Sequence, residues 1–222
     1  MLYVVATPIG NLGDITLRAI ETIKSCNFVI AENPRYSQRL LQHIGAWPKE
    51  MVQFAEYNEQ QVVKELSRRL SKEDGCLISD AGTPGISDPG FRLVRECVKN
   101  NIQVIPIPGA NAAIAALSAS GLPTDKFLFL GFLQKTASKT VSALQEAATA
   151  EATAIFYESP ERIFKTLGYI SNAFPTSQVV IAREVTKLHE EFIRGTPIQV
   201  MDLLKEKPSV KGEMTVLISF KN

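Results

Sequence analysis

The stretch Cys76–Pro106, CLISDAGTPGISDPGFRLVRECVKNNIQVIP, shows the pattern from which the fold is predicted. Cys76–Ser79 is a short apolar run that indicates a strand, and Phe91–Lys99 carries apolar residues at helical spacing. Gln103–Pro106 indicates a second strand. Because parallel strands are joined by helical crossovers, this order of elements predicts an open, mainly parallel sheet.

The same alternation extends outward through residues 1–120. β-Branched runs predict strands, and the amphipathic segments between them predict helices on both faces of the sheet. The other predicted elements are the strand Leu2–Ala6, a helix capped by Asp14 or Thr16 that carries Leu17, Ile20 and Ile23, the strand Asn27–Ala31, the helix Tyr36–Ile44, the weaker strand Met51–Phe54, a helix carrying Val62, Val63, Leu66 and Leu70, and the helix Asn111–Ala119.

The segment Ser120–Asp125, SGLPTD, predicts a linker, so we expect one α/β domain over residues 1–120 and another over 121–222. The short distance between the Val179–Ala182 and Glu190–Arg194 runs predicts a hairpin, and hence a mixed second sheet. The remaining predicted elements are the strand Phe127–Leu130, the helix Thr140–Ala148, the strand Thr153–Tyr157, the helix Pro160–Ile170, the helix Ile198–Leu204 and the strand Met214–Phe220.

The amino-acid composition bears on the binding partners of the protein and on the redox state of its compartment. With 24 Lys and Arg against 23 Asp and Glu, the chain has no global basic field, so a nucleic-acid partner would have to meet locally concentrated charge. The three cysteines, Cys26, Cys76 and Cys97, lack metal or disulfide spacing and are predicted to be buried thiols in a reducing compartment. No apolar run reaches the length of a membrane span.

Three loops follow predicted strands at positions where open α/β sheets bind ligands. Thr7–Asp14 resembles a dinucleotide loop with Glu32 in the place of a ribose-binding acid, but Pro8 replaces its first glycine. In Ser79–Gly90, three glycines and two prolines expose rigid backbone, and Asp80 is placed to accept hydrogen bonds.

In the same loop, Asp88 and Pro89 are predicted to be the N-cap and first turn of the next helix. The third loop, Pro106–Asn111, has Asn111 at a predicted N-cap and Gly109 where close backbone approach is possible. Together the three loops predict a cleft for a nucleoside-like ligand.

Several motifs together resemble one enzyme family. They are ATPIGNLGDIT (6–16), DAGTPGISDPG (80–90), PGANAAIAAL (108–117), SGLP (120–123), GFL (131–133), YESPER (157–162) and AREVTKLHEE (182–191). On these motifs, which span most of the chain, it is identified as a member of the RsmI-type 16S rRNA 2′-O-ribose methyltransferases. These enzymes belong to the tetrapyrrole-methylase superfamily.

The resemblance implies a cytoplasmic homodimeric enzyme of two α/β domains that binds S-adenosylmethionine in the cleft between them and needs no metal. It implies a cytidine ribose of 16S rRNA in the small ribosomal subunit as methyl acceptor, and no membrane partner. Carried over by motif, the donor-binding residues are Ile9, Asp80, Ala81, Gly82, Thr83, Ile86, Asn111, Ala112, Phe132, Tyr157, Ala182 and Thr215.

Methyl transfer to a ribose hydroxyl is an in-line displacement that a general base or a nearby cation would assist. The catalytic candidates are Glu32, Glu158, Lys187 and Glu190, with His189 and Glu191 beside them. Each also has a structural interpretation: Glu158 can support a helix start, and Glu190 with Glu191 can be a solvated pair on a strand.

The chain departs from the family at two places. Ala31–Arg35 reads AENPR where members read AEDTR, so Asn33 replaces an acid and Pro34 removes a hydroxyl and a backbone donor. Residues 134–140 keep only Lys135 and Lys139 of a denser basic cluster, which predicts weaker phosphate contacts. We expect a compact rRNA methyltransferase without the C-terminal extension of many members, with a relative of other substrate as the alternative.

Three other functions remain open from the sequence. A tetrapyrrole or other small-molecule methyltransferase would suit the low net charge. A non-catalytic relative that keeps the donor cleft would suit Asn33 and Pro34. A dinucleotide-dependent oxidoreductase would need the glycine that Pro8 replaces.

Overall fold

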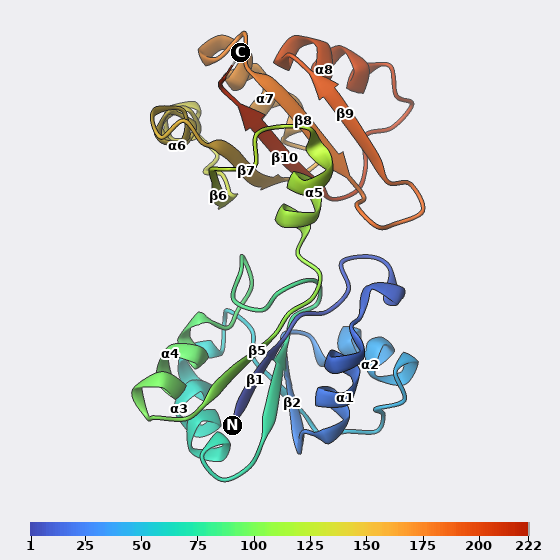
Figure 1. The fold of residues 1–222 in the computed structure, drawn as a ribbon, viewed down its shortest axis with the longest axis vertical. Helices are drawn as coiled ribbons and strands as arrows, with labels where there is room; N and C mark the ends of the chain where they lie inside the picture. The colour runs from blue at the N-terminus through green and yellow to red at the C-terminus, as the bar shows by residue number, and fades with distance from the viewer. Residues whose placement is uncertain (222) are drawn as a thin grey trace. The chain divides into compact units, whose positions relative to one another are not determined.

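The computed structural model describes residues 1–221, which form two compact units (Figure 1). The first unit is Met1–Asn111, and the second begins at Ala112. Each unit contains one five-stranded sheet. The prediction of two α/β domains, the first with a parallel and the second with a mixed sheet, is therefore confirmed.

The sheet of the first unit is entirely parallel, in the order β3-β2-β4-β1-β5. Every residue of β2 and β4 is buried, as expected for central strands covered on both faces. The strands are β1 (Leu2–Val5), β2 (Phe28–Ala31), β3 (Met51–Gln53), β4 (Gly75–Ile78) and β5 (Val104–Ile107).

Two pairs of helices cover this sheet, one pair on each face (Figure 1). Helices α1 (Leu17–Ser25) and α2 (Pro34–His43) pack on one face around Ile23 and Leu41. Helices α3 (Glu59–Leu70) and α4 (Phe91–Lys99) pack on the other. All three cysteines are buried free thiols in these two cores, as predicted.

The ends of the helices show which local expectations hold. Thr16 caps α1, because its side chain accepts a hydrogen bond from the Ala19 N–H. The prediction that Asp88 caps α4, with Pro89 in its first turn, is wrong: Gly90 occupies the N-cap and the helix begins at Phe91. Gly90 has φ of 149°, and a Cβ there would lie 3.0 Å from the Gly85 nitrogen, so the loop closes on itself before the helix starts.

The second unit has a mixed sheet in the order β6-β7-β10-β8-β9. β6 pairs with β7 in parallel, and the other neighbours are antiparallel, including the predicted β8–β9 hairpin. The strands are β6 (Phe127–Phe132), β7 (Thr153–Glu158), β8 (Gln178–Arg183), β9 (Glu191–Gly195) and β10 (Met214–Ser219).

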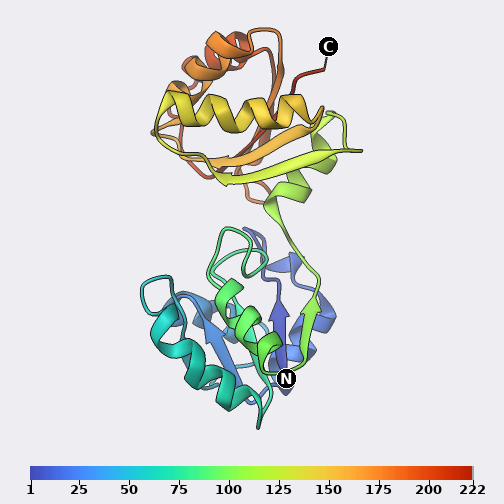
Figure 2. The ribbon, with the colours of Figure 1, turned by 90° about the vertical axis from the view of Figure 1, so that its left-hand side faces the viewer.

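The helices of the second unit are divided unequally between the two faces of its sheet. α6 (Ala137–Thr149), α7 (Ile163–Ala173) and α8 (Pro197–Lys205) pack on one face around Phe156 and Val216. The nine-residue α5 (Ala112–Ser120) packs on the other, so that α5 and α6 lie on opposite sides of the strands (Figure 2).

The boundary between the two units lies after Asn111, whereas the sequence predicts it after residue 120. The helix α5 accounts for the difference, because Ala113, Ala116 and Leu117 are buried against the second sheet. Arg194 of β9 also donates hydrogen bonds to the Ser120 and Ala119 carbonyls, at 3.0 and 2.7 Å. Among residues 1–221, no helix is long and apolar enough to cross a membrane.

Two glycine-to-alanine substitutions should change stability in opposite directions. At Gly75 a Cβ would lie 2.7 Å from the Phe28 ring, so Gly75→Ala should lower the free energy of unfolding by about 1–3 kcal/mol. At Gly168, inside α7, nothing lies within 4 Å, so Gly168→Ala should raise it by about 0.5–1 kcal/mol. Calorimetry resolves both effects; equal melting shifts would contradict the packing around Gly75.

Candidate functional site

The three predicted loops of the first unit meet at the carboxyl ends of β1, β4 and β5. Thr7 and Gly82 exchange two backbone hydrogen bonds, of 2.8 and 3.1 Å, which join the first loop to the second. The Thr83 hydroxyl donates to the Ala110 carbonyl at 3.2 Å and joins the second loop to the third. The loop cluster, by which we mean residues 7–14, 79–90 and 107–111, is therefore one connected structure.

Two glycines allow the backbones of the loop cluster to approach closely. Gly82 has φ of 81°, and a Cβ on it would lie 3.3 Å from Cγ2 of Ile9. A Cβ on Gly109 would lie 3.0 Å from the Ala6 Cβ. Ile9 is buried beneath this contact, while Ile86 is 43% exposed. The loop cluster thus combines a tightly packed interior around Ile9 with an accessible apolar residue, Ile86.

Three carboxyl groups, Glu32, Asp80 and Asp88, lie together at the ends of β2 and β4. Burial raises the pKa of Glu32, and the nearby Asp80 charge raises it further. Burial also raises the pKa of Asp80, against a hydrogen bond from the Asn33 backbone that lowers it. The pKa of Asp88 rises to about 6, through burial first and then through Glu32, against a hydrogen bond from Ser79.

Asp80 also carries an unsatisfied polar atom. Its Oδ1 is buried and has no hydrogen-bond partner among the described residues. A buried acceptor without a partner is costly, and a ligand that donates to it would recover that energy. The cluster therefore suits a ligand with a positive or hydrogen-bond-donating group. Within residues 1–221, no three His, Cys, Asp or Glu side chains are arranged to hold a metal ion.

In the second unit, the four residues taken from the family motifs form one row across the sheet. Phe132 pairs with Tyr157, Tyr157 with Thr215, and Thr215 with Ala182. Because side chains opposite one another share a face of a sheet, all four point the same way. The Phe132 and Tyr157 rings make an edge contact with centroids 5.5 Å apart, and Phe132 is 61% exposed.

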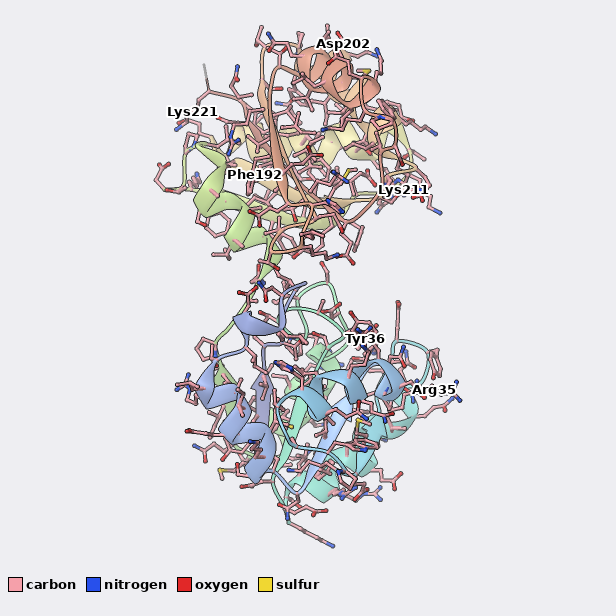
Figure 3. The ribbon with its side chains drawn as sticks, turned by 90° about the vertical axis from the view of Figure 1, so that its right-hand side faces the viewer. Arg35, Tyr36, Phe192, Asp202, Lys211 and Lys221 are labelled. Carbon is pink, nitrogen blue, oxygen red and sulfur yellow. The ribbon has the colours of Figure 1, made fainter. Side chains whose placement is uncertain are left out.

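The same face of the sheet carries two further aromatic residues that the sequence did not suggest. Phe192 of β9 pairs with Ala182, and Phe129 of β6 contacts the Tyr157 ring at 5.2 Å between centroids. Phe192, labelled in Figure 3, packs against the core that α5 forms with the second sheet. Sequence reasoning missed both phenylalanines, although the alternation of side chains along a strand places Phe192 on a defined face once the pairing is known.

Glu158 lies on the other face of this sheet, with the α6–α8 core. It pairs with Met214, which belongs to that core, and it is only 2% exposed. Its Oε1 accepts a hydrogen bond from the Ser159 N–H at 2.8 Å, and its Oε2 accepts one from the Thr166 hydroxyl at 2.6 Å. Oε1 is thus engaged by the loop that follows β7 and Oε2 by α7, which matches the structural interpretation of this residue.

Lys187 and Glu190 lie in the loop between β8 and β9 and hold that loop together. Burial lowers the pKa of Lys187, but its bonds to Glu213 and Glu184, at 2.8 and 3.0 Å, raise it overall. Glu190 accepts a hydrogen bond from the Thr186 N–H. Lys187 is therefore a paired cation rather than a proton acceptor.

The same loop contains strain that the sequence did not reveal. Thr186, a β-branched residue, has φ of 69°, and Glu184 has φ of 51°. The Thr186 hydroxyl is buried without a partner among residues 1–221. Such conformations persist only where surrounding contacts impose them.

A sequence profile of the Tetrapyrrole (Corrin/Porphyrin) Methylases matches residues 1–199 of the chain. The chain belongs to this family. Its relatives include two proteins named Ribosomal RNA small subunit methyltransferase I. The one from Hydrogenobaculum sp. is 45% identical over 100% of the chain and 96% of the relative. The one from Halalkalibacterium halodurans is 45% identical over 98% of the chain and 75% of the relative.

Solved structures share the fold of this chain at much lower identity. A diphthine synthase superposes with a TM-score of 0.75 at 13% identity, covering 98% of the chain and 89% of the synthase. The methyltransferase CobJ superposes with a TM-score of 0.71 at 16% identity, covering 98% and 93%. At these identities the likeness concerns the fold alone.

The raised pKa of Asp88 predicts a pH-dependent stability difference. Between its ordinary pKa of 3.8 and about 6, the folded protein binds more protons at this group than the unfolded chain does, so the group's contribution falls as pH rises. At neutral pH, Asp88→Asn should therefore raise the free energy of unfolding by about 1 kcal/mol, allowing for solvent screening.

Urea unfolding at acidic and neutral pH measures this effect, with the exposed Asp125→Asn as the control. The advantage of Asp88→Asn should shrink toward zero near pH 4. An advantage that is constant with pH would show that the Asp88 charge is not desolvated in the folded protein.

Proposed function

We propose that the chain is an S-adenosylmethionine-dependent enzyme that methylates the 2′-hydroxyl of a cytidine ribose in 16S rRNA of the small ribosomal subunit. The observation that carries the proposal is 45% identity over the whole chain to a protein named Ribosomal RNA small subunit methyltransferase I. The match extends over both units, so it includes the loop cluster as well as the row of residues on the second sheet.

The residues of the loop cluster fit the proposed donor. The unsatisfied Asp80 Oδ1 and the carboxyl groups of Glu32 and Asp88 would attract the positive sulfonium or ammonium group. Gly82 and Gly109 carry no side chain that would block a close approach of the loop backbones. We propose that Ile9, Asp80, Ala81, Gly82, Thr83, Ile86, Asn111 and Ala112 bind the donor.

The second unit contributes an apolar and aromatic surface to the same proposal. Phe132, Tyr157, Ala182 and Thr215 share one face of the sheet. Planar aromatic groups of a nucleoside stack favourably on such rings. We therefore include these four residues in the donor-binding set.

The bound donor would supply a methyl group already activated by its sulfonium, so the protein's task is to align and deprotonate the acceptor hydroxyl. Among the four catalytic candidates, Glu32 is the one we favour. Its raised pKa suits a general base, whereas Glu158, Lys187 and Glu190 are engaged within the second unit. Glu32 also lies beside Asp80, next to the proposed donor position.

We further propose that the enzyme works in the cytoplasm as a homodimer. Buried thiols suit a reducing compartment, and Phe127 is an exposed apolar residue that a second copy would cover. Analytical ultracentrifugation measures the association directly; a monomer at micromolar concentration would refute the dimer.

The function is tested by incubating the protein with tritiated S-adenosylmethionine and small ribosomal subunits that lack the modification. The label should enter 16S rRNA, and nuclease digestion should yield 2′-O-methylcytidine. Label on a base would refute ribose methylation. Transfer to a tetrapyrrole but not to RNA would establish the small-molecule alternative.

Donor binding should depend on the Asp80 charge. Asp80→Asn keeps the shape of the side chain but removes its charge, so calorimetric titration with S-adenosylmethionine should show at least about tenfold weaker affinity, or about 1.4 kcal/mol. The melting temperature should not fall, because the buried Oδ1 has no partner to lose and the amide oxygen can still accept the hydrogen bond from the Asn33 backbone. Asp202→Asn, far along the chain on α8, is the charge-matched control. Equal donor affinity in both variants would remove Asp80 from the site.

A further inference from the structure

The outer face of α2 carries cations and an aromatic ring without any acid. Its exposed residues are Arg35, Tyr36, Arg39, Gln42 and His43, which we call the α2 face. Ser37, Leu40 and Leu41 lie on the opposite, buried side. Arg35 and Arg39 are four residues apart, so they follow one another along the same side of the helix.

The two arginines of the α2 face are free. Neither makes an ion pair or a side-chain hydrogen bond with any residue between 1 and 221. Tyr36 is 53% exposed, so its ring is accessible to a ligand. Figure 3 shows the Arg35 side chain pointing outward from the first unit.

Among the helices of residues 1–221, α2 alone carries two arginines and no acid; α7 also lacks an acid, but its one cation, Lys165, lies over the ring of its own Tyr169. α3 mixes its cations with Glu59 and Glu65, and Arg69 on it is bound to Glu50 and Glu73. α4 carries Glu96, and its Arg92 is paired with Glu59. In a chain whose net charge is only +1, the α2 face is a local concentration of unneutralised positive charge.

The position of α2 connects this charge to the loop cluster. The helix begins at Pro34, directly after β2 and Glu32, and Arg35 and Tyr36 lie in its first turn. The Asn33 backbone also bonds to Asp80. The α2 face therefore starts at the edge of the proposed donor site and extends away from it along the helix.

We propose that the α2 face is the surface that holds the RNA strand, a proposal that rests on the proposed function. Arg35 and Arg39 bind successive backbone phosphates, and Tyr36 stacks on a base next to the methylated nucleotide. Guanidinium groups and an exposed ring are the combination that binds unpaired RNA. A protein partner with an acidic face would not require the ring, and a membrane would require more apolar residues than this face offers.

The test compares two double variants at the same helical spacing. Arg35→Gln with Arg39→Gln removes the α2 charge, and Lys64→Gln with Arg68→Gln removes two exposed, unpaired cations of α3 as the matched control. Binding to purified small ribosomal subunits is measured by filter binding between about 50 and 200 mM salt. The α2 variant should bind about tenfold or more weakly, and its slope of log K against log salt should be shallower by about 1.4–1.8.

Tyr36→Ala provides a second readout. Loss of a stacked base should weaken binding to the subunits about fivefold to a hundredfold while leaving the salt slope unchanged, because no charge is removed. Melting temperatures of all variants should equal that of the native protein, since the altered side chains are exposed and unpaired.

The outcomes separate a failure of RNA binding by the α2 face from a failure of the proposed methyltransferase function. Equal affinity and slope in the two double variants would overturn the role of the α2 face, even if methyl transfer to the subunits persists. Loss of binding to anionic lipid vesicles but not to subunits would overturn it in favour of a membrane. If the native protein binds no S-adenosylmethionine, the proposed function fails. A lower RNA affinity of the α2 double variant than of the α3 double variant would still support RNA binding by the α2 face.

Discussion

The reciprocal hydrogen bonds between Thr7 and Gly82 hold together the edge of the first unit on which the rest of its candidate site depends. The loops that they join follow strands β1 and β4, which are neighbours in the sheet, although about seventy residues separate them. Because Gly82 adopts positive φ and packs against Ile9, the loop bearing Asp80 is pressed close to the first loop. In the same loop, the Asp80 Oδ1 is buried and has no partner among residues 1–221.

The carboxyl cluster and the α2 face show how one short segment can place opposite charges side by side. Glu32 follows the end of β2 and lies near Asp80, and its pKa rises through burial. Two residues later Pro34 starts α2, where its missing N–H needs no partner, and Arg35 then turns outward into solvent. The AENPR departure is thus compatible with a regular helix start, and the first turn keeps its cation.

In the second unit, the two faces of the mixed sheet are covered unequally. Three helices bury one face, while the nine-residue α5 buries only part of the other, so Phe132 and Tyr157 remain accessible or half-buried. The hairpin between β8 and β9 is held by Lys187, Glu184 and Glu213, and its strained Thr186 is maintained by these contacts. These ion pairs explain why the AREVTKLHEE segment is rich in ionisable residues, since a residue that stabilises the hairpin needs no role in catalysis.

Local pattern by itself determined the order of strands and helices, the hairpin, the three loops and the family. These properties depend on periodicity, turn residues and motifs that neighbouring residues supply. Only the tertiary structure decided that Asp88 joins a carboxyl cluster instead of capping α4, that Glu158 faces the helical core, and that α5 belongs to the second unit. Each of these outcomes depends on contacts between segments far apart in the chain, and burial and pKa depend on such contacts too.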